Sequence, residues 1–187
     1  MRVVLIGDSI RMGYEPYVRQ ELADLADVWG PTDNGGTSRN VLDHLADWVL
    51  NDPPDLLHIN CGLHDLKRTA ASPEPAVALA DYEANLRAIF SRLRAAQIAT
   101  LWATCTPVNQ VWHARGSLRR REEDVIAYNR VALRVAQQYG LPINDLYCLI
   151  TSLGRDLYLS QDGRHFVPAG YALLGRAVAD QIRRHLP

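Results

Sequence analysis

A serine near the beginning of the sequence follows a segment that is expected to be a strand. Residues 3–6, Val-Val-Leu-Ile, are apolar and mostly β-branched, which predicts a short strand buried on both faces. Gly7 permits a sharp turn, and Asp8 and Ser9 follow it at once. Because ligands bind at the carboxyl ends of the strands in open parallel sheets, Ser9 is a candidate nucleophile. The alternative is that Asp8 or Ser9 only caps the next helix.

A carboxylate and an imidazole lie close together near the other end of the sequence. Asp162 and His165 stand just before a helix that Pro168 can open at its first turn. A serine hydroxyl is a poor nucleophile near neutral pH unless a base takes its proton, and imidazole titrates in that range. A carboxylate that orients the imidazole completes the group. Ser9, Asp162 and His165 therefore predict nucleophilic catalysis, although Asp-x-x-His before a helix is also a common cap beside a surface histidine.

The sequence resembles the SGNH (GDSL-type) hydrolase family of esterases, lipases and acetyl-group hydrolases in four blocks. These are residues 7–10 (Gly-Asp-Ser-Ile), 34–38 (Asn-Gly-Gly-Thr-Ser), 60–65 (Asn-Cys-Gly-Leu-His-Asp) and 162–165 (Asp-Gly-Arg-His). The resemblance implies that Ser9 is the nucleophile, His165 the base and Asp162 the orienting carboxylate. It also implies a serine esterase for small acyl esters, acetyl esters of carbohydrates among them, that needs no cofactor.

The resemblance also implies an oxyanion hole with one unusual member. The backbone N–H groups of Ser9 and Gly36 are the expected donors, with Gly35 as the alternative glycine. The family has asparagine where this sequence has His64. A neutral imidazole also donates one hydrogen bond, so His64 is a candidate substitute donor, and Asn60 is another.

Several polar or charged side chains near the blocks are candidates for binding substrate, namely Asp8, Arg11, Asn60 and Arg164. A guanidinium pairs bidentately with a carboxylate, so Arg11, Arg164 and also Arg39 would suit an acidic substrate group. Because nearly all basic residues of this chain are arginine, solvated or structural roles are the alternative.

The other chemically active side chains have ordinary interpretations. The spacing of His58, Cys61 and His64 places successive side chains on different faces, whereas zinc sites use close ligand pairs on turns or helices. We therefore expect no metal site. Trp112 and His113, on a long loop, either wall the substrate pocket or pack within that loop.

The composition is that of an ordinary soluble globular protein and excludes several classes of partner. Of the 187 residues, 48% are apolar and 22% charged, and the net charge of −1 indicates neither nucleic acid nor an anionic membrane as partner. A small-molecule ester is the expected partner, and the oligomeric state stays open. Cys61, Cys105 and Cys148 are widely spaced, and the sequence begins directly with a core strand. Together these features predict a cytoplasmic protein without a membrane span.

The order of the expected elements predicts the fold. Strands are expected at residues 3–6, 28–29, 55–60, 98–104 and 141–144, and helices at 14–26, 40–50, around 82–93, 119–139 and 168–185. Alternating strands and helices predict an α/β fold, a flavodoxin-like three-layer α/β/α sandwich with a five-stranded parallel sheet, as one domain over residues 1–187. The loops after the first four strands and the last block would then meet at one edge.

Two other functions remain compatible with the sequence. One is a non-catalytic module that binds carbohydrate or acyl groups, its oxyanion hole degraded at His64. The other is a nucleotide or phosphate binder that uses residues 7–13 as an anion loop. Neither G-x-x-x-x-G-K-[ST] nor G-x-G-x-x-G occurs in that segment, which disfavours the second.

Overall fold

A parallel sheet forms the middle layer of the protein. The computed structural model describes residues 1–69, 71–113 and 118–186. Five strands pair in parallel in the order β2-β1-β3-β5-β7. Their bounds are β1 (Arg2–Ile6), β2 (Asp27–Trp29), β3 (Leu56–Ile59), β5 (Thr100–Ala103) and β7 (Ile143–Asn144). This is the flavodoxin-like order, and the predicted five-stranded parallel sheet is confirmed.

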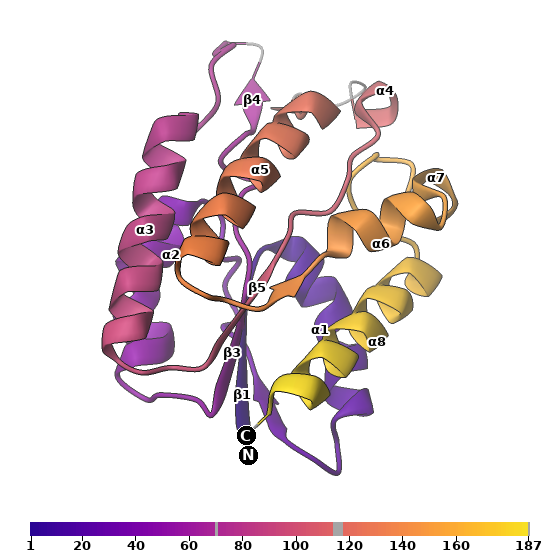
Figure 1. Ribbon diagram of the computed structural model, residues 1–187. Helices are drawn as coiled ribbons and strands as arrows, with labels where there is room; N and C mark the ends of the chain where they lie inside the picture. Colours follow the sequence, from indigo (N-terminus) through magenta and orange to yellow (C-terminus); the bar gives the residue numbers. More distant parts are fainter. Residues whose placement is uncertain (70, 114–117, 187) are drawn as a thin grey trace.

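Helices cover both faces of the sheet. Figure 1 shows α1 (Ser9–Glu21) and α8 (Pro168–His185) on one face and α2 (Ser38–Leu45), α3 (Leu79–Ala95) and α5 (Glu122–Gln138) on the other. The strand residues between these layers are fully buried, as at Val4 and Leu57. The predicted three-layer α/β/α sandwich is therefore confirmed.

The two helices on the first face approach each other closely. A Cβ on Gly175 of α8 would lie 2.4 Å from the Cβ of Tyr17 and 3.1 Å from the carbonyl oxygen of Tyr14, both in α1. Contacts this short require a residue without a side chain. Since α1 begins at Ser9 and α8 begins just after His165, this packing joins the two ends of the candidate site.

Several helices start at other residues than predicted, and side-chain caps set the start of α1 and α2. The helix predicted from residue 14 begins at Ser9, where the Asp8 side chain accepts a hydrogen bond from the N–H of Ile10 (2.9 Å). The helix predicted at 40–50 begins at Ser38 and continues into a π-helical turn, η1 (Ala46–Leu50). The helix predicted from residue 119 begins at Glu122. Only the last helix, at 168–185, has the predicted bounds.

Two stretches predicted as loops contain short elements. A small antiparallel sheet pairs β4 (Arg68–Thr69) with β6 (Leu118–Arg119), and α4 (Gln110–His113) lies between β5 and β6. The sequence predicted no helix or strand between residues 60 and 82 or between residues 104 and 119, so these short elements were missed. Residues 114–117 lie outside the described residues. Elements of two to four residues are too short for a periodic signal. Two further helices, α6 (Leu146–Ser152) and α7 (Arg155–Tyr158), lie between β7 and α8.

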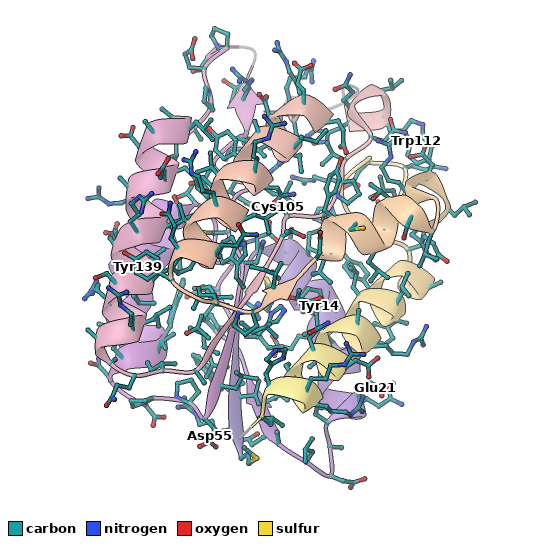
Figure 2. All side chains as sticks on the ribbon, viewed as in Figure 1. Tyr14, Glu21, Asp55, Cys105, Trp112 and Tyr139 are labelled. Carbon is teal, nitrogen blue, oxygen red and sulfur yellow. The ribbon has the colours of Figure 1, made fainter. Side chains whose placement is uncertain are left out.

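The carboxyl ends of the strands define the functional edge. Asp55, which precedes β3, lies at one end of the molecule, and Trp112, in the chain that follows β5, lies at the other (Figure 2). The turns after β1, β3 and β5 leave the sheet at this second edge, as expected from its parallel topology.

The described residues include no helix with both the length and the apolar composition that crossing a membrane requires. Their cysteines are free thiols; Cys61 and Cys105 are buried and Cys148 is exposed.

Candidate active site

The turn after β1 presents Ser9 at the start of a helix. Asp8 is buried and caps α1, so Ser9 is the first helical residue. Its Oγ lies 2.8 Å from Nε2 of His165. Being at the first helical position, the N–H of Ser9 has no partner within the helix and points out from its positive end.

The imidazole of His165 has a carboxylate on its other side. Nδ1 of His165 lies 2.5 Å from Oδ2 of Asp162. Since the carboxylate only accepts, Nδ1 carries the proton that joins the two, and Nε2 is left to accept the hydroxyl proton of Ser9. The structure thus brings Ser9, His165 and Asp162 into one hydrogen-bonded row. Such a row can activate a hydroxyl for attack on a carbonyl carbon.

A tight loop holds the carboxylate in place. Oδ1 of Asp162 accepts the backbone N–H groups of His165 (2.9 Å) and Arg164 (3.0 Å) and the hydroxyl of Ser160 (2.8 Å). Gly163 adopts φ +73°, a conformation that favours glycine, and so allows the chain to fold back on Asp162. Burial alone would raise the pKa of the Asp162 carboxyl, but the hydrogen bonds from His165, Ser160 and Arg164 outweigh it and hold the pKa well below its usual range. The group is therefore an anion wherever His165 works as a base.

Gly35 of the second block lies against the turn that carries Ser9. The N–H of Gly35 donates to the carbonyl oxygen of Gly7 (3.0 Å). A Cβ on Gly35 would lie 2.7 Å from that same oxygen, so this contact requires glycine. The N–H of Gly36, the expected oxyanion donor, donates to Oδ1 of Asn34 (2.9 Å). To bind an oxyanion, Gly36 must exchange that acceptor for the substrate.

His64 lies half-buried in the turn after β3. Burial lowers the pKa of its imidazole; the Asp8 carboxylate opposes this shift, and the positive charge of Arg120 adds to it. The ring is therefore neutral near pH 7 and can donate one hydrogen bond. Asn60, the other candidate donor, directs its amide group to the carbonyl oxygen of Ala103 (2.8 Å) and so links β3 to β5.

The arginines predicted to bind substrate are engaged within the protein. Arg11 is buried and donates to Glu15 (2.5 Å) and to the carbonyl oxygen of Pro31 (2.8 Å). Arg164 contacts the carboxylate of Asp162 (3.3 Å). Arg39 is exposed and pairs with its helix neighbour Asp43 (3.1 Å). Of the three, Arg164 lies at the candidate site.

Asp65 supports the second block. Its carboxylate accepts the backbone N–H (2.9 Å) and the hydroxyl (2.5 Å) of Ser38, the first residue of α2. Burial raises its pKa to about 6, although the two hydrogen bonds from Ser38 oppose the shift. The contact ties the turn after β3 to the loop that carries Gly36.

Within residues 1–69, 71–113 and 118–186, no group of His, Cys, Asp or Glu side chains is arranged to hold a metal ion. His58 is fully buried in β3, where its Nε2 contacts the amide of Asn144 (3.2 Å), and burial lowers its pKa to about 3.

Sequence reasoning missed two residues at this site. Ser160 donates its hydroxyl to the carboxylate of Asp162, and no pattern in the sequence indicates this contact between two side chains. Arg120 is buried and donates to the carbonyl oxygen of Leu63 (2.6 Å). No pattern in the sequence marks Arg120, because it stands in a run of three arginines.

Comparison with known proteins gives a family and a fold. The sequence profile of the GDSL-like Lipase/Acylhydrolase family matches residues 5–173. Among curated proteins, none matches this sequence.

Solved structures share the architecture at low identity. A lipase/acylhydrolase from Enterococcus faecalis has a TM-score of 0.84 at 24% identity, over 100% of this chain and 97% of that one. The acetyl xylan esterase AlAXEase has a TM-score of 0.77 at 18% identity, over 97% and 100%. A variant of Axe2, an acetyl-xylooligosaccharide esterase from Geobacillus Stearmophilus, has a TM-score of 0.79 at 21% identity, over 97% and 93%. These similarities show a common fold that extends over nearly all of each chain.

Proposed function

This chain belongs to the GDSL-like lipase/acylhydrolase family, and we propose that it is a serine esterase that hydrolyses small acyl esters. Its preferred substrates are acetyl esters of carbohydrates. The observation that carries the proposal is the 2.8 Å contact between Oγ of Ser9 and Nε2 of His165, with Asp162 on the far side of the ring. Two proteins of the same fold, an acetyl xylan esterase and an acetyl-xylooligosaccharide esterase, support the acetyl group and the carbohydrate alcohol.

The reaction runs through an acyl-enzyme. Oγ of Ser9 forms a bond to the ester carbonyl carbon while its proton passes to Nε2 of His165. The oxyanion that develops is stabilised by the N–H groups of Ser9 and Gly36 and by His64. Collapse breaks the bond to the alcohol, which leaves with the proton from His165. Water then repeats the attack with the same base, which releases the carboxylic acid and restores Ser9.

Ser9→Ala tests the proposal. We expect the variant to fold with an unchanged melting temperature and to lose hydrolysis of p-nitrophenyl acetate and labelling by a fluorophosphonate, which reacts only with an activated serine. Ser152→Ala, at the exposed end of α6, is the matched control and should keep both. Equal rates for Ser9→Ala and the parent would exclude the proposed nucleophile. A parent protein that is not labelled but binds acetylated sugar would instead indicate a non-catalytic binding module.

The substrate class needs a second measurement. The rate should fall as the acyl chain of p-nitrophenyl esters lengthens, and acetylated xylo-oligosaccharides should release acetate. Faster hydrolysis of long-chain esters than of the acetate would contradict the acetyl preference while leaving the esterase activity intact.

A further inference from the structure

Arg120, between β6 and α5, is a buried cation beside the candidate site. Only 2% of its surface is exposed. Its Nε donates to the carbonyl oxygen of Leu63 (2.6 Å), and its Nη1 lies 3.2 Å from Nε2 of His113. These acceptors are a backbone carbonyl and an imidazole, and not a carboxylate. Burial lowers the pKa of the guanidinium to about 10, so it stays charged at neutral pH. A buried charge whose hydrogen-bond acceptors are neutral is costly, and the carboxylates of Asp8 and Asp162 offset only part of that cost.

His113, at the end of α4, extends this contact to the loop of residues 160–165 that carries Asp162 and His165, here called the acid–base loop. Its Nδ1 lies 3.1 Å from the backbone carbonyl oxygen of Asp162. Arg120 only donates, so Nε2 of His113 must accept, and Nδ1 carries the proton that it donates to Asp162. Burial lowers the pKa of His113, which keeps the ring in this neutral form. One row of hydrogen bonds thus runs from Leu63 through Arg120 and His113 to Asp162.

One end of this row lies in the turn after β3 and the other in the acid–base loop. The proposed reaction requires a defined distance between these two parts of the site. Leu63 directly precedes His64, the candidate oxyanion donor, and Asp162 directly orients His165. The turn after β3 and the acid–base loop are far apart in sequence and lie in different segments. Arg120 and His113 contact both segments and so help to set the distance between them in space.

Residues 109–113, here called the α4 segment, also contact the acid–base loop at Gly163. The N–H of Asn109 donates to the carbonyl oxygen of Gly163 (2.7 Å). A Cβ on Gly163 would lie 2.4 Å from the carbonyl oxygen of Asn109 and 2.8 Å from the backbone nitrogen of His113. The loop therefore lies directly on the α4 backbone, and a shift of α4 would move Asp162 with it.

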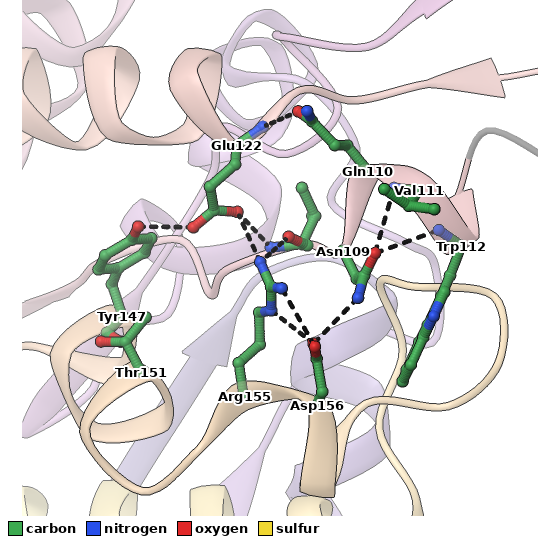
Figure 3. A network of polar contacts seen from close by, with 10 residues as sticks. Asn109, Gln110, Val111, Trp112, Glu122, Tyr147, Thr151, Arg155 and Asp156 are labelled. Carbon is green, nitrogen blue, oxygen red and sulfur yellow. Dashed lines mark hydrogen bonds and ion pairs between the residues drawn. The ribbon is translucent and has the colours of Figure 1, made fainter.

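A second network fixes the α4 segment to the rest of the protein. Figure 3 shows the side chain of Asn109 between the start of α4 and Asp156, whose carboxylate accepts from it (3.1 Å) and pairs with Arg155 (2.7 Å). Glu122, at the start of α5, accepts the N–H of Val108 (2.8 Å). The segment is thus anchored at its beginning by these residues and at its end by the contact between His113 and Arg120.

We propose that Arg120 and His113 are positioning residues that set the acid–base loop in register with the oxyanion turn, so that His165 and His64 act on the same carbonyl group. The inference rests on the proposed esterase function. Neither residue takes part in bond making. Their loss should lower the rate of the chemical step and leave substrate binding nearly unchanged.

The test uses Arg120→Met and His113→Phe, which keep volume and remove hydrogen bonds. Kinetics with p-nitrophenyl acetate are normalised to active sites titrated with a fluorophosphonate. We expect kcat per titrated site to fall by about 10- to 100-fold with KM changed less than about threefold, since small misplacements of catalytic groups cost this much. Arg121→Met is the matched control: Arg121 is the exposed neighbour, it pairs with Glu123 (3.4 Å), and its removal should leave kcat unchanged.

The double variant separates a shared role from two independent ones. If the two residues act as one row, Arg120→Met combined with His113→Phe should lose no more kcat than the worse single variant. Additive losses, or a full kcat per titrated site with only a lower melting temperature, would overturn the proposal. If Arg120→Met does not fold, His113→Phe alone carries the same kcat and KM test. A parent protein that the fluorophosphonate does not label would overturn both the esterase function and this inference, whereas a labelled parent with unaffected variants overturns the inference alone.

Discussion

Oγ of Ser9 lies 2.8 Å from Nε2 of His165, although 156 positions separate the two residues in the sequence. Ser9 opens α1, and His165 stands just before α8. These helices pack on the same face of the sheet and against each other (Figure 1). The packing of these two helices therefore brings together the two segments that carry the hydroxyl and the imidazole.

The close approach of α1 and α8 predicts the effect of a single methyl group. Gly175→Ala would place a Cβ 2.4 Å from that of Tyr17, so α8 must shift away from α1. We expect the free energy of unfolding to fall by about 1–3 kcal/mol, measured by urea denaturation, because overpacking outweighs the better helix propensity of alanine. Arg176→Ala, at the exposed neighbouring position, should change it by less than about 0.5 kcal/mol. A more stable Gly175→Ala would show that the two helices are not in tight contact.

Asp162→Asn tests the orientation of the base. The amide oxygen can still accept the N–H groups of the loop, but an NH₂ group then faces Nδ1 of His165. The imidazole must turn to its other tautomer, in which Nε2 carries a proton and cannot accept that of Ser9. We expect kcat for p-nitrophenyl acetate to fall by about 10³- to 10⁴-fold at unchanged fold. Ser160→Ala, which removes one hydrogen bond from the same carboxylate, should cost about tenfold or less. Similar losses in the two variants would argue against a tautomer effect.

Substitutions at His64 test the unusual oxyanion donor. If the neutral ring donates to the oxyanion, His64→Ala should lower kcat by about 10²- to 10³-fold with little change in KM. His64→Asn restores an N–H donor and should recover part of that loss. Lys67→Ala, at a half-buried position in the same stretch of chain, serves as the control for general disturbance of the turn. An unaffected kcat in His64→Ala would leave the backbone N–H groups as the whole oxyanion hole.

Buried His58 predicts how stability depends on pH. Burial lowers the pKa of its ring from 6.5 to about 3. Between these two pH values the ring is protonated in the unfolded chain and neutral in the folded protein. Its contribution is therefore complete above pH 6.5 and is lost as the pH falls toward 3. His58→Gln does not titrate and keeps an acceptor for Asn144. Between pH 7 and 5 the parent should lose about 2 kcal/mol more unfolding free energy than this variant, measured in urea. Parallel curves would mean that His58 does not govern acid sensitivity.

The sequence predicted the five strands of the parallel sheet, because strong apolar runs determine them. Two separate sequence blocks also predicted that Ser9 and His165 lie together. The sequence was less informative about the direction in which a side chain points. Arg11 was expected near substrate because it follows Ser9 closely, but a residue two positions along a helix points away from the first, and Arg11 instead contacts the carbonyl oxygen of Pro31.

Other features depend on contacts between distant segments. Arg120 and Leu63 are 57 positions apart, and neither residue stands in a periodic pattern that would indicate their contact. The two-residue strands β4 and β6 exist only because they pair with each other. The acceptor at the N–H of Gly36 is a local side chain, Asn34, and such a competing bond is visible only in three dimensions.

The contribution of both chain ends to one hydrogen-bonded row has a consequence for synthesis. A ribosome delivers the first turn, with its serine, long before the imidazole emerges. Until the final helix docks, the nascent polypeptide carries an ordinary, unreactive alcohol. The proposed esterase activity therefore requires the segment before the final helix as well as the first turn of the chain.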